Sequence, residues 1–187
     1  MNYLETVKDL CLIAQGFFET KQEPFEKVVE ACGRSLLAGG KILLFGNGGS
    51  AAEAQHFAAE LVNKFYRVRS ALPALALTTD GSVLTSIAND SSYDRVFSRQ
   101  VEALGTAGDV AIGLSTSGIS ANVLEGLRAA KAKNMVTVAL TGKGGAEMAS
   151  LADHLLDVPC KTTPRIQEVH LLILHLLAEM LEEKFSS

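Results

Sequence analysis

The sequence predicts an α/β protein with a doubly wound parallel sheet that carries helices on both faces. Short and wholly apolar runs of strand length, such as 42–45 and 110–114, alternate along the chain with longer segments of helical periodicity. Strands without polar/apolar alternation are typical of parallel sheets that are buried on both sides. Ligands of such sheets bind beyond the carboxyl ends of the strands, so we expect function in the loops that follow the strands.

Length and charge favour one domain that handles a small molecule. The chain has 187 residues and is 48% hydrophobic, which suits a single globular unit over residues 1–187. Its formal net charge of −4 argues against nucleic acid or an anionic membrane as the main partner. The sequence contains no recognisable signal segment and no apolar run near the roughly 20 residues that span a bilayer, so we expect a cytoplasmic protein. The cysteines Cys11, Cys32 and Cys160 lack CxxC spacing, and we expect reduced packing residues.

Two amphipathic helices precede the first strand. Apolar residues recur every three or four positions over 3–21, Pro24 interrupts the pattern, and a second helical pattern covers 25–37. No strand comes before these helices, so neither can belong to a βαβ unit. They must pack at the edge of the core or against another subunit, and we favour an oligomerisation role for residues 1–38, with the α/β core over 39–187.

The remaining elements follow in alternation. Further strands are predicted at 74–78, 136–140 and 155–158, besides the two named above. Helices are predicted from residue 51 onward, over 82–88, 94–103 and 121–133, around Met148, and from Pro164 to about Phe185, where proline suits the first turn.

A glycine-rich loop follows the first strand and opens an alanine-rich helix. Its residues are Gly46, Asn47, Gly48, Gly49 and Ser50. Such a loop directs backbone N–H groups and the positive end of the helix dipole at one point, and glycine lets an anion approach the backbone. We therefore expect a phosphorylated substrate here.

Other interpretations of this loop remain open. The segment also satisfies G-x-G-x-x-A, the dinucleotide fingerprint, but the expected acidic residue about 20 positions later is replaced by the basic region 66–69. A phosphate-loop NTPase requires a GK[ST] ending, which is absent. A plain turn between strand and helix is the remaining alternative.

A second loop favours phosphate more strongly. Four hydroxyl residues follow the strand at 110–114: Ser115, Thr116, Ser117 and Ser120. Together with backbone N–H groups at a helix N-terminus, they form a neutral donor set that can hold a phosphoryl group without Arg or Lys. Helix capping alone would account for one hydroxyl and leave three unexplained.

Two helices carry polar residues in apolar surroundings. His56 and Glu60 are four residues apart and share a helix face, where they could hold a metal ion or a substrate, although an exposed pair is the ordinary alternative. The last helix is almost wholly apolar except for Gln167, Glu168, His170, His175 and Glu179. For His170 we favour a hydrogen-bonded core or interface residue.

In combination, these motifs resemble the phosphoheptose isomerases of the sugar isomerase (SIS) fold, which is flavodoxin-like. The resemblance covers essentially the whole chain and rests on GNGGSAAEAQHFAAEL, the IAND at 87–90, STSGISAN at 115–122, ALTGKGG, and RIQEVHLLILH at 165–175. It implies a homotetramer with active sites between subunits that converts sedoheptulose 7-phosphate to D-glycero-D-manno-heptose 7-phosphate for bacterial surface glycans.

The resemblance also implies roles for individual residues. The phosphate would be held by Ser115, Thr116, Ser117 and Ser120, and the sugar site would include Asn47, Gly48, Gly49, Ser50, Glu60, Asn89, Asp90 and Gln167. Glu60 and His175 match the catalytic pair, and His56, Glu60, Gln167 and His175 match the ligands of one zinc ion per subunit. Gln167 and His175 are about 12 Å apart along a straight helix at 1.5 Å per residue. Both reach one ion only if Gln167 extends from a frayed helix start, or if different subunits supply them.

The implied chemistry is aldose-ketose isomerisation through an enediol(ate). Glu60 would move a proton between C1 and C2, and His175 would exchange protons with O1 and O2. The chain also resembles a replication-initiation regulator of the same fold that binds the initiator protein, a binding module that lacks the equivalents of Glu60 and His175. A sugar-phosphate sensor of a transcription factor would need a fused DNA-binding module, and a nicotinamide dehydrogenase is disfavoured by the missing ribose acid.

Overall fold

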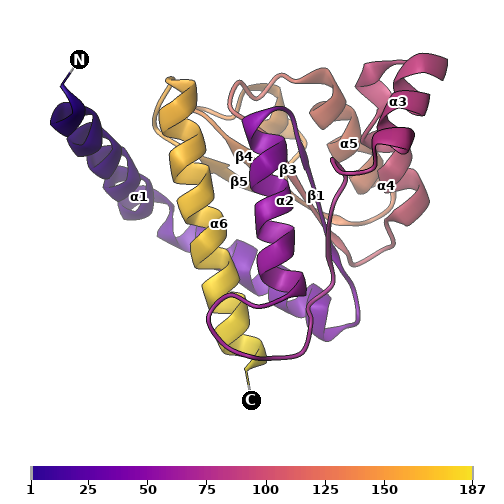
Figure 1. Ribbon diagram of the computed structural model, residues 1–187, viewed down its shortest axis with the longest axis horizontal. Coiled ribbons are helices and arrows are strands. Elements are labelled where there is room, and N and C mark those ends of the chain that lie inside the picture. Colours follow the sequence, from indigo (N-terminus) through magenta and orange to yellow (C-terminus); the bar gives the residue numbers. More distant parts are fainter. Residues whose placement is uncertain (1, 187) are drawn as a thin grey trace.

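The computed structural model describes residues 2–186, which form three layers around a five-stranded parallel sheet (Figure 1). The strands are β1 (Ile42–Gly46), β2 (Ala74–Ala76), β3 (Val110–Ser115), β4 (Val136–Thr141) and β5 (His154–Asp157). Every neighbouring pair is parallel, in the order β2-β1-β3-β4-β5. The predicted doubly wound α/β sheet is confirmed. Met1 and Ser187, the ends of the expected domain, lie outside the described residues.

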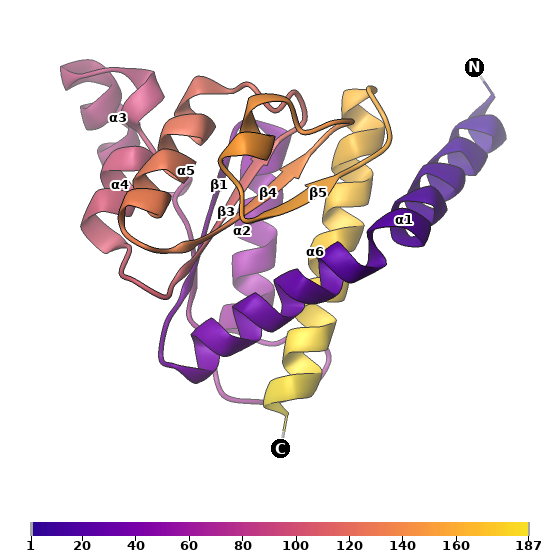
Figure 2. The same ribbon diagram turned by 180° about the vertical axis from the view of Figure 1, so that it is seen from behind.

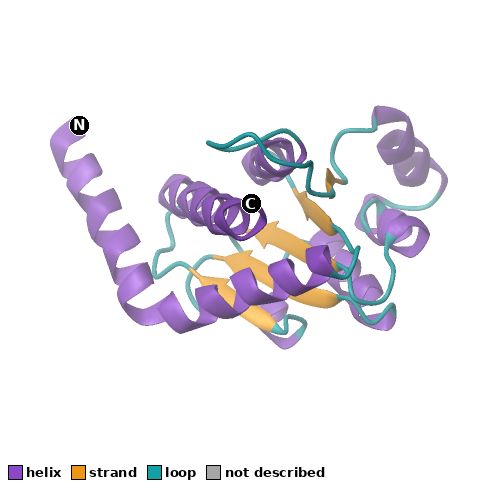
Figure 3. Ribbon diagram, turned by 90° about the horizontal axis from the view of Figure 1, so that it is seen from below, coloured by secondary structure: helices purple, strands orange, loops and turns teal. Residues whose placement is uncertain are grey.

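Each face of the sheet has its own layer of helices, and Figure 3 shows the strands between them. Ile42 and Leu44 point to one face and pack with α1 (Tyr3–Leu37), α2 (Gly49–Val62) and α6 (Thr163–Phe185). Leu43 and Phe45 point to the other face and pack with α4 (Ser98–Leu104) and α5 (Ala121–Ala132). Because side chains alternate along a strand, an unbroken apolar run fills both cores at once. The remaining elements are α3 (Gly81–Asp90) and the 3₁₀ turns η1 (Tyr93–Arg95) and η2 (Ala146–Ser150).

The two leading helices form one long helix with a kink, α1. The break lies at Lys21, whose φ of −122° and ψ of 15° are not helical, rather than at Pro24. Pro24 sits in the first turn after the break, where its missing N–H costs no hydrogen bond. The second half of α1 packs in the core of its own chain, and the oligomerisation role for residues 1–38 stays a prediction. Only the first half projects away from the body (Figure 2).

Some boundaries and packing roles differ from the predictions. β2 ends at Ala76, since it is an edge strand paired only with β1. The predicted helix over 94–103 divides into η1 and α4, because Val96 and Phe97 turn into the core between them. Cys32 is buried, as a packing residue should be, whereas Cys11 is exposed. Within residues 2–186, no helix is long and apolar enough to cross a membrane.

The strand order reverses between β1 and β3, and this reversal creates the site. The chain leaves β1 for the outer strand β2 and then returns to the other side of β1 as β3. Gly46 at the end of β1 pairs with Leu114 near the end of β3. The two predicted loops therefore start side by side at the carboxyl edge, the position where ligands bind in such folds.

Candidate functional site

A cavity of about 310 Å³ opens where the two loops meet. It is lined by both loops and the start of α6: Asn47, Gly48, Gly49, Ser50, Leu114, Ser115, Thr116, Ser117, Ser120, Thr163 and Gln167. The structure thus brings together all the predicted residues of the two loops except Gly46, and it also brings the predicted Gln167 from the far end of the chain. Thr163 was not predicted, although a hydroxyl residue beside Pro164 at a helix start is a recognisable signal.

Three helix N-termini border this cavity. Gly48 is the N-cap of α2, Ser120 is the N-cap of α5, and Thr163 is the first residue of α6. Helix N-termini carry free N–H groups and the positive ends of helix dipoles, which favour anions. No lysine or arginine is among the described residues that line the cavity. The arrangement suits a phosphate group bound by dipoles and hydroxyls.

The hydroxyls of the second loop are available to a ligand. Ser115 Oγ lies 2.9 Å from Ser120 Oγ and 3.3 Å from Ser117 Oγ, so the three side chains form one cluster. Although Ser120 occupies the N-cap position of α5, its side chain makes no capping hydrogen bond. Capping therefore does not explain this serine. Ser115 Oγ and Ser117 Oγ also accept hydrogen bonds from the backbone N–H groups of Gly118 and Ile119, so these two hydroxyls support the loop and still have their O–H groups to donate.

Glycine shapes the site at two points. A Cβ atom on Gly49 would lie 2.5 Å from Nε2 at the end of the Gln167 side chain, so glycine leaves room for this side chain to lie against the wall of the cavity. Gly118 has a φ of +70°, and its Cβ would lie 2.5 Å from the carbonyl oxygen of Gly145. Gly49 allows a close approach of a side chain, whereas Gly118 allows both a close approach and a left-handed backbone conformation.

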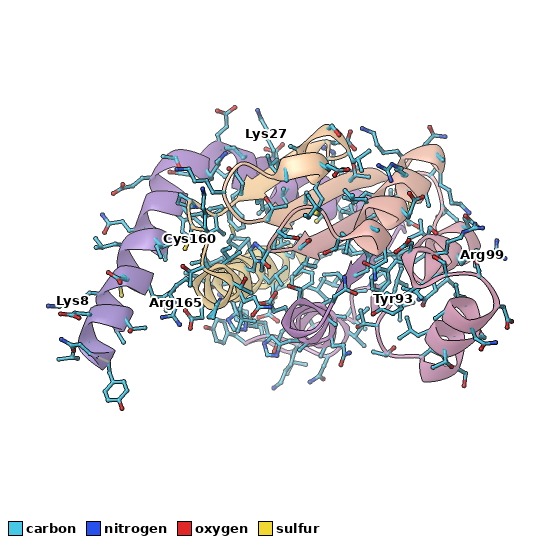
Figure 4. The ribbon with its side chains drawn as sticks, turned by 90° about the horizontal axis from the view of Figure 1, so that it is seen from above. Lys8, Lys27, Tyr93, Arg99, Cys160 and Arg165 are labelled. Carbon is cyan, nitrogen blue, oxygen red and sulfur yellow. The ribbon has the colours of Figure 1, made fainter. Side chains whose placement is uncertain are left out.

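Asn47 is held in place by two residues that sequence reasoning missed. Asn47 Nδ2 donates to Asn122 Oδ1 at 2.9 Å, and Asn122 Nδ2 donates back to Asn47 Oδ1 at 2.8 Å. Tyr93 Oη donates to the same Asn47 Oδ1 at 3.2 Å. Figure 4 shows Tyr93 in the interior of the view, whereas Arg99 lies at the periphery. Asn122 closes the STSGISAN motif, which was the available signal for it.

The predicted catalytic residues meet where α2 and α6 run side by side (Figure 1). His56 Nε2 lies 2.8 Å from His175 Nε2 and 3.4 Å from Glu60 Oε1. Partial burial lowers the pKa of His175, the His56 ring beside it lowers it further, and Glu60 acts in the opposite direction. The pair of imidazoles and the carboxylate can exchange protons with a substrate that reaches them.

This cluster lies farther along the same helices than the cavity. Gly49 and Gln167 touch at the helix starts, whereas His56 is seven residues beyond Gly49, about 10 Å at 1.5 Å per residue. His175 is eight residues beyond Gln167, about 12 Å by the same measure. The geometry therefore presents an anion site at one end and acid–base groups about 10 Å away.

The predicted zinc ligands are not all together within one chain. His56, Glu60 and His175 offer the nitrogen and oxygen donors that zinc accepts, but Gln167 lies in the cavity, against Gly49. Over residues 2–186, no group of three or more His, Cys, Asp or Glu side chains is arranged to hold a metal ion. The donor chemistry fits zinc, and the four-ligand geometry does not form within one chain.

Asn89 and Asp90 also lie apart from the cavity. They end α3, where Asn89 Nδ2 donates to Asp90 Oδ1 at 2.8 Å. Asp90 lines a separate hollow of about 240 Å³ together with Arg95 and Arg99. Within one chain, this part of the predicted sugar site does not meet the rest.

His170 is a core residue, which confirms the interpretation we favoured. Its side chain is fully buried, and Nε2 donates to the carbonyl oxygen of Thr141 at 3.1 Å. Burial lowers the pKa of His170 to about 4, so the ring is neutral and Nδ1 is an acceptor. Glu53 Oε2 lies 3.9 Å from this Nδ1, and burial raises the pKa of Glu53 to about 7. At 3.9 Å the two atoms do not form a hydrogen bond, and among the described residues neither has a hydrogen-bond partner.

Comparison with known proteins gives a consistent result. The SIS domain family model matches residues 2–142. The phosphoheptose isomerase of Paramagnetospirillum magneticum is 58% identical over 161 residues, which cover 86% of this chain and 84% of that protein. The phosphoheptose isomerase of Thermodesulfovibrio yellowstonii is 46% identical over 181 residues, covering 97% and 88%.

Solved structures show the same relationship. The phosphoheptose isomerase of Neisseria gonorrhoeae superimposes with a TM-score of 0.91 at 44% identity and covers 96% of each chain. The enzyme of that name from Francisella tularensis superimposes with a TM-score of 0.88 at 32% identity, over 98% of this chain and 100% of that one. With the fold, the loops at the strand reversal and these relatives in agreement, the chain belongs to the phosphoheptose isomerase family of SIS-domain proteins.

Proposed function

We propose that this protein is an aldose-ketose isomerase that converts sedoheptulose 7-phosphate to D-glycero-D-manno-heptose 7-phosphate. The observation that supports it best is the separation of two sites along α2 and α6. The cavity offers dipoles and hydroxyls to the phosphate, and His56, Glu60 and His175 lie about 10 Å farther along the same helices. An extended heptose phosphate anchored by its C7 phosphate would bring C1 and C2 to those groups.

In this proposal, the chain's own residues move the protons. The Glu60 carboxylate removes a proton from C1 of the ketose and returns it to C2 of the enediol(ate). His175 takes the proton from O1 and delivers one to O2, so the product aldose contains the same atoms as the substrate. The lowered pKa of His175 suits this exchange, because the ring is then largely neutral near pH 7 and can accept a proton.

One zinc ion per subunit is part of the proposal. His56, Glu60 and His175 would hold it, with Gln167 supplied by another copy of the chain. When bound, zinc would polarise the substrate carbonyl as a Lewis acid. A metal-bound carboxylate is a weaker base, so the two roles of Glu60 compete.

We also propose a cytoplasmic homotetramer with active sites between subunits, supplying heptose for bacterial surface glycans such as lipopolysaccharide. The separation of Asn89 and Asp90 from the cavity supports this assembly, since an interface would be needed to complete the sugar site. The exposed apolar side chains on the projecting half of α1, Leu4, Val7 and Leu12, provide a surface for it.

Turnover of sedoheptulose 7-phosphate by the purified protein tests the function. Wild type should convert it, and Glu60→Gln and His175→Ala should each lower kcat at least a thousandfold with the fold intact by circular dichroism. Glu183→Gln, whose side chain is exposed on the same helix α6, is the matched control and should retain activity. A folded wild-type tetramer, loaded with zinc, that gives no turnover would favour the alternative, a regulator that binds the replication initiator protein.

A further inference from the structure

A buried carboxylate near the end of α6 holds the loop that follows α2. Glu182 is 2% exposed and accepts hydrogen bonds from the backbone N–H groups of Phe65 at 2.9 Å, Tyr66 at 2.7 Å and Arg67 at 2.8 Å. Burial opposes its ionisation, but the three N–H groups and the nearby Arg69 outweigh burial and lower the pKa of Glu182. An ionised carboxylate is therefore built into the structure at this point.

Arg69 connects this carboxylate to the backbone of Glu60. Its Nε lies 3.3 Å from Glu182 Oε1, and its side chain is 1% exposed. Nη2 donates to the carbonyl oxygen of Glu60 at 2.9 Å, and Nη1 donates to the carbonyl oxygen of Leu61 at 2.9 Å. These carbonyls belong to the last turn of α2, which has no partners within the helix. The guanidinium thus fixes the turn that carries Glu60.

The same loop reaches His175. The Phe65 ring lies 5.7 Å from the His175 ring, centroid to centroid, at an interplanar angle of 38°. Glu182 follows His175 by seven residues, two turns of α6, so both side chains lie on one face of that helix. By holding the backbone N–H of Phe65, Glu182 keeps this aromatic wall against the imidazole.

We propose that Glu182 and Arg69 are positioning residues for the isomerisation. Their connected hydrogen bonds fix the position of the Glu60 backbone and of the Phe65 ring that packs against His175. Neither touches the phosphate cavity, so the network acts on the acid–base groups and leaves anchoring of the phosphate unchanged. This inference rests on the proposed isomerase function.

The substitution Arg69→Lys separates positioning from folding. Lysine keeps a positive charge beside Glu182, but a single ammonium does not bridge two carbonyls as the planar guanidinium does. Arg67→Lys is the matched control, because Arg67 lies on the same loop with an exposed side chain. Glu182→Gln, with the exposed neighbour Glu183→Gln as its control, probes the other end of the network.

Activity should be measured well below the thermal midpoint of each variant. We expect Arg69→Lys and Glu182→Gln to lower kcat by about 10- to 100-fold with the KM for sedoheptulose 7-phosphate within about twofold, since a small misplacement of a catalytic group costs rate rather than binding. The controls should match wild type. Nuclear magnetic resonance of the metal-free protein supplies a second readout, in which the imidazole signals of His175 should shift in Arg69→Lys and not in Arg67→Lys.

A folded Arg69→Lys with wild-type kcat and unchanged His175 signals would overturn the inference, as would a loss that appears only in KM. If Glu182→Gln fails to fold, Arg69→Lys decides alone. Absence of turnover in the wild type would instead overturn the proposed function, and the His175 signals would still report whether the network sets that ring.

Discussion

His56 Nε2 and His175 Nε2 face each other at 2.8 Å, although the two residues are 119 positions apart in the sequence. At this distance one ring nitrogen donates a proton to the other, or both present lone pairs to a shared cation. Glu60 Oε1, 3.4 Å from His56, adds a negative charge to the same point. The contact marks the place where α2 and α6 jointly offer groups to a ligand.

If zinc binds this pair, removing one imidazole should weaken it strongly. We expect His56→Ala to bind zinc at least tenfold more weakly than wild type, because a nitrogen ligand is lost. The zinc content of the dialysed protein, measured by mass spectrometry of the metal, provides the check. His154→Ala, on β5 at the far edge of the sheet, is the matched control and should keep its zinc. Full zinc content in His56→Ala would exclude this residue as a ligand.

Loss of single hydroxyls from the cavity should weaken substrate binding. Ser117→Ala and Ser120→Ala each remove a donor to the phosphate, and hydrogen bonds to charged groups contribute about 1.5–3 kcal/mol. We expect KM to rise by about tenfold or more with kcat nearly unchanged. Ser150→Ala is the control, since that hydroxyl bonds to the carbonyl of Glu147 outside the cavity. A fall in kcat at constant KM would contradict phosphate anchoring by these serines.

The buried Glu53 should make stability depend on pH. Burial raises its pKa from 4.5 to about 7 in the folded state, so the folded protein binds more protons than the unfolded chain within this window. The contribution of Glu53 to the free energy of unfolding is fully present below about pH 4.5 and is lost as the pH rises through 7. His170 acts in the opposite direction: its pKa is lowered from 6.5 to about 4, and its contribution is lost as the pH falls through that window.

Glu53→Gln isolates the carboxyl group, because the amide has nearly the same size as a protonated carboxyl group and cannot ionise. As the pH rises from 5 to 8, the free energy of unfolding of this variant should increase relative to that of wild type, by an amount on the order of 3 kcal/mol. Thermal or denaturant unfolding at both pH values provides the measurement. Glu147→Gln, an exposed carboxyl on η2, should follow the wild-type pH dependence. Parallel curves for wild type and Glu53→Gln would show that Glu53 is ionised in the folded protein.

Much of the anion site was predictable because its signals are local. The glycine-rich loop at 46–50 and the second loop at 115–120 each follow a buried strand. Because the carboxyl ends of parallel strands lie at one edge of the sheet, both loops start at that edge. The pairing of Gly46 with Leu114 then brings them together. Thr163 and Asn122 escaped prediction because a single hydroxyl or amide at a helix start is common in any sequence.

The sequence by itself determined the parallel sheet, the two loops that converge at its edge, and the polar residues on α2 and α6. Each of these features follows from a short periodic pattern of residues or from the residues of one turn. The tertiary structure alone decided which of those residues meet. His175 contacts His56 while Gln167 remains at Gly49, and Arg69 reaches the carbonyl of Glu60 through the ion pair with Glu182. The physical reason is that periodicity specifies which face of a helix is buried, whereas packing against a neighbour sets its partner along that face.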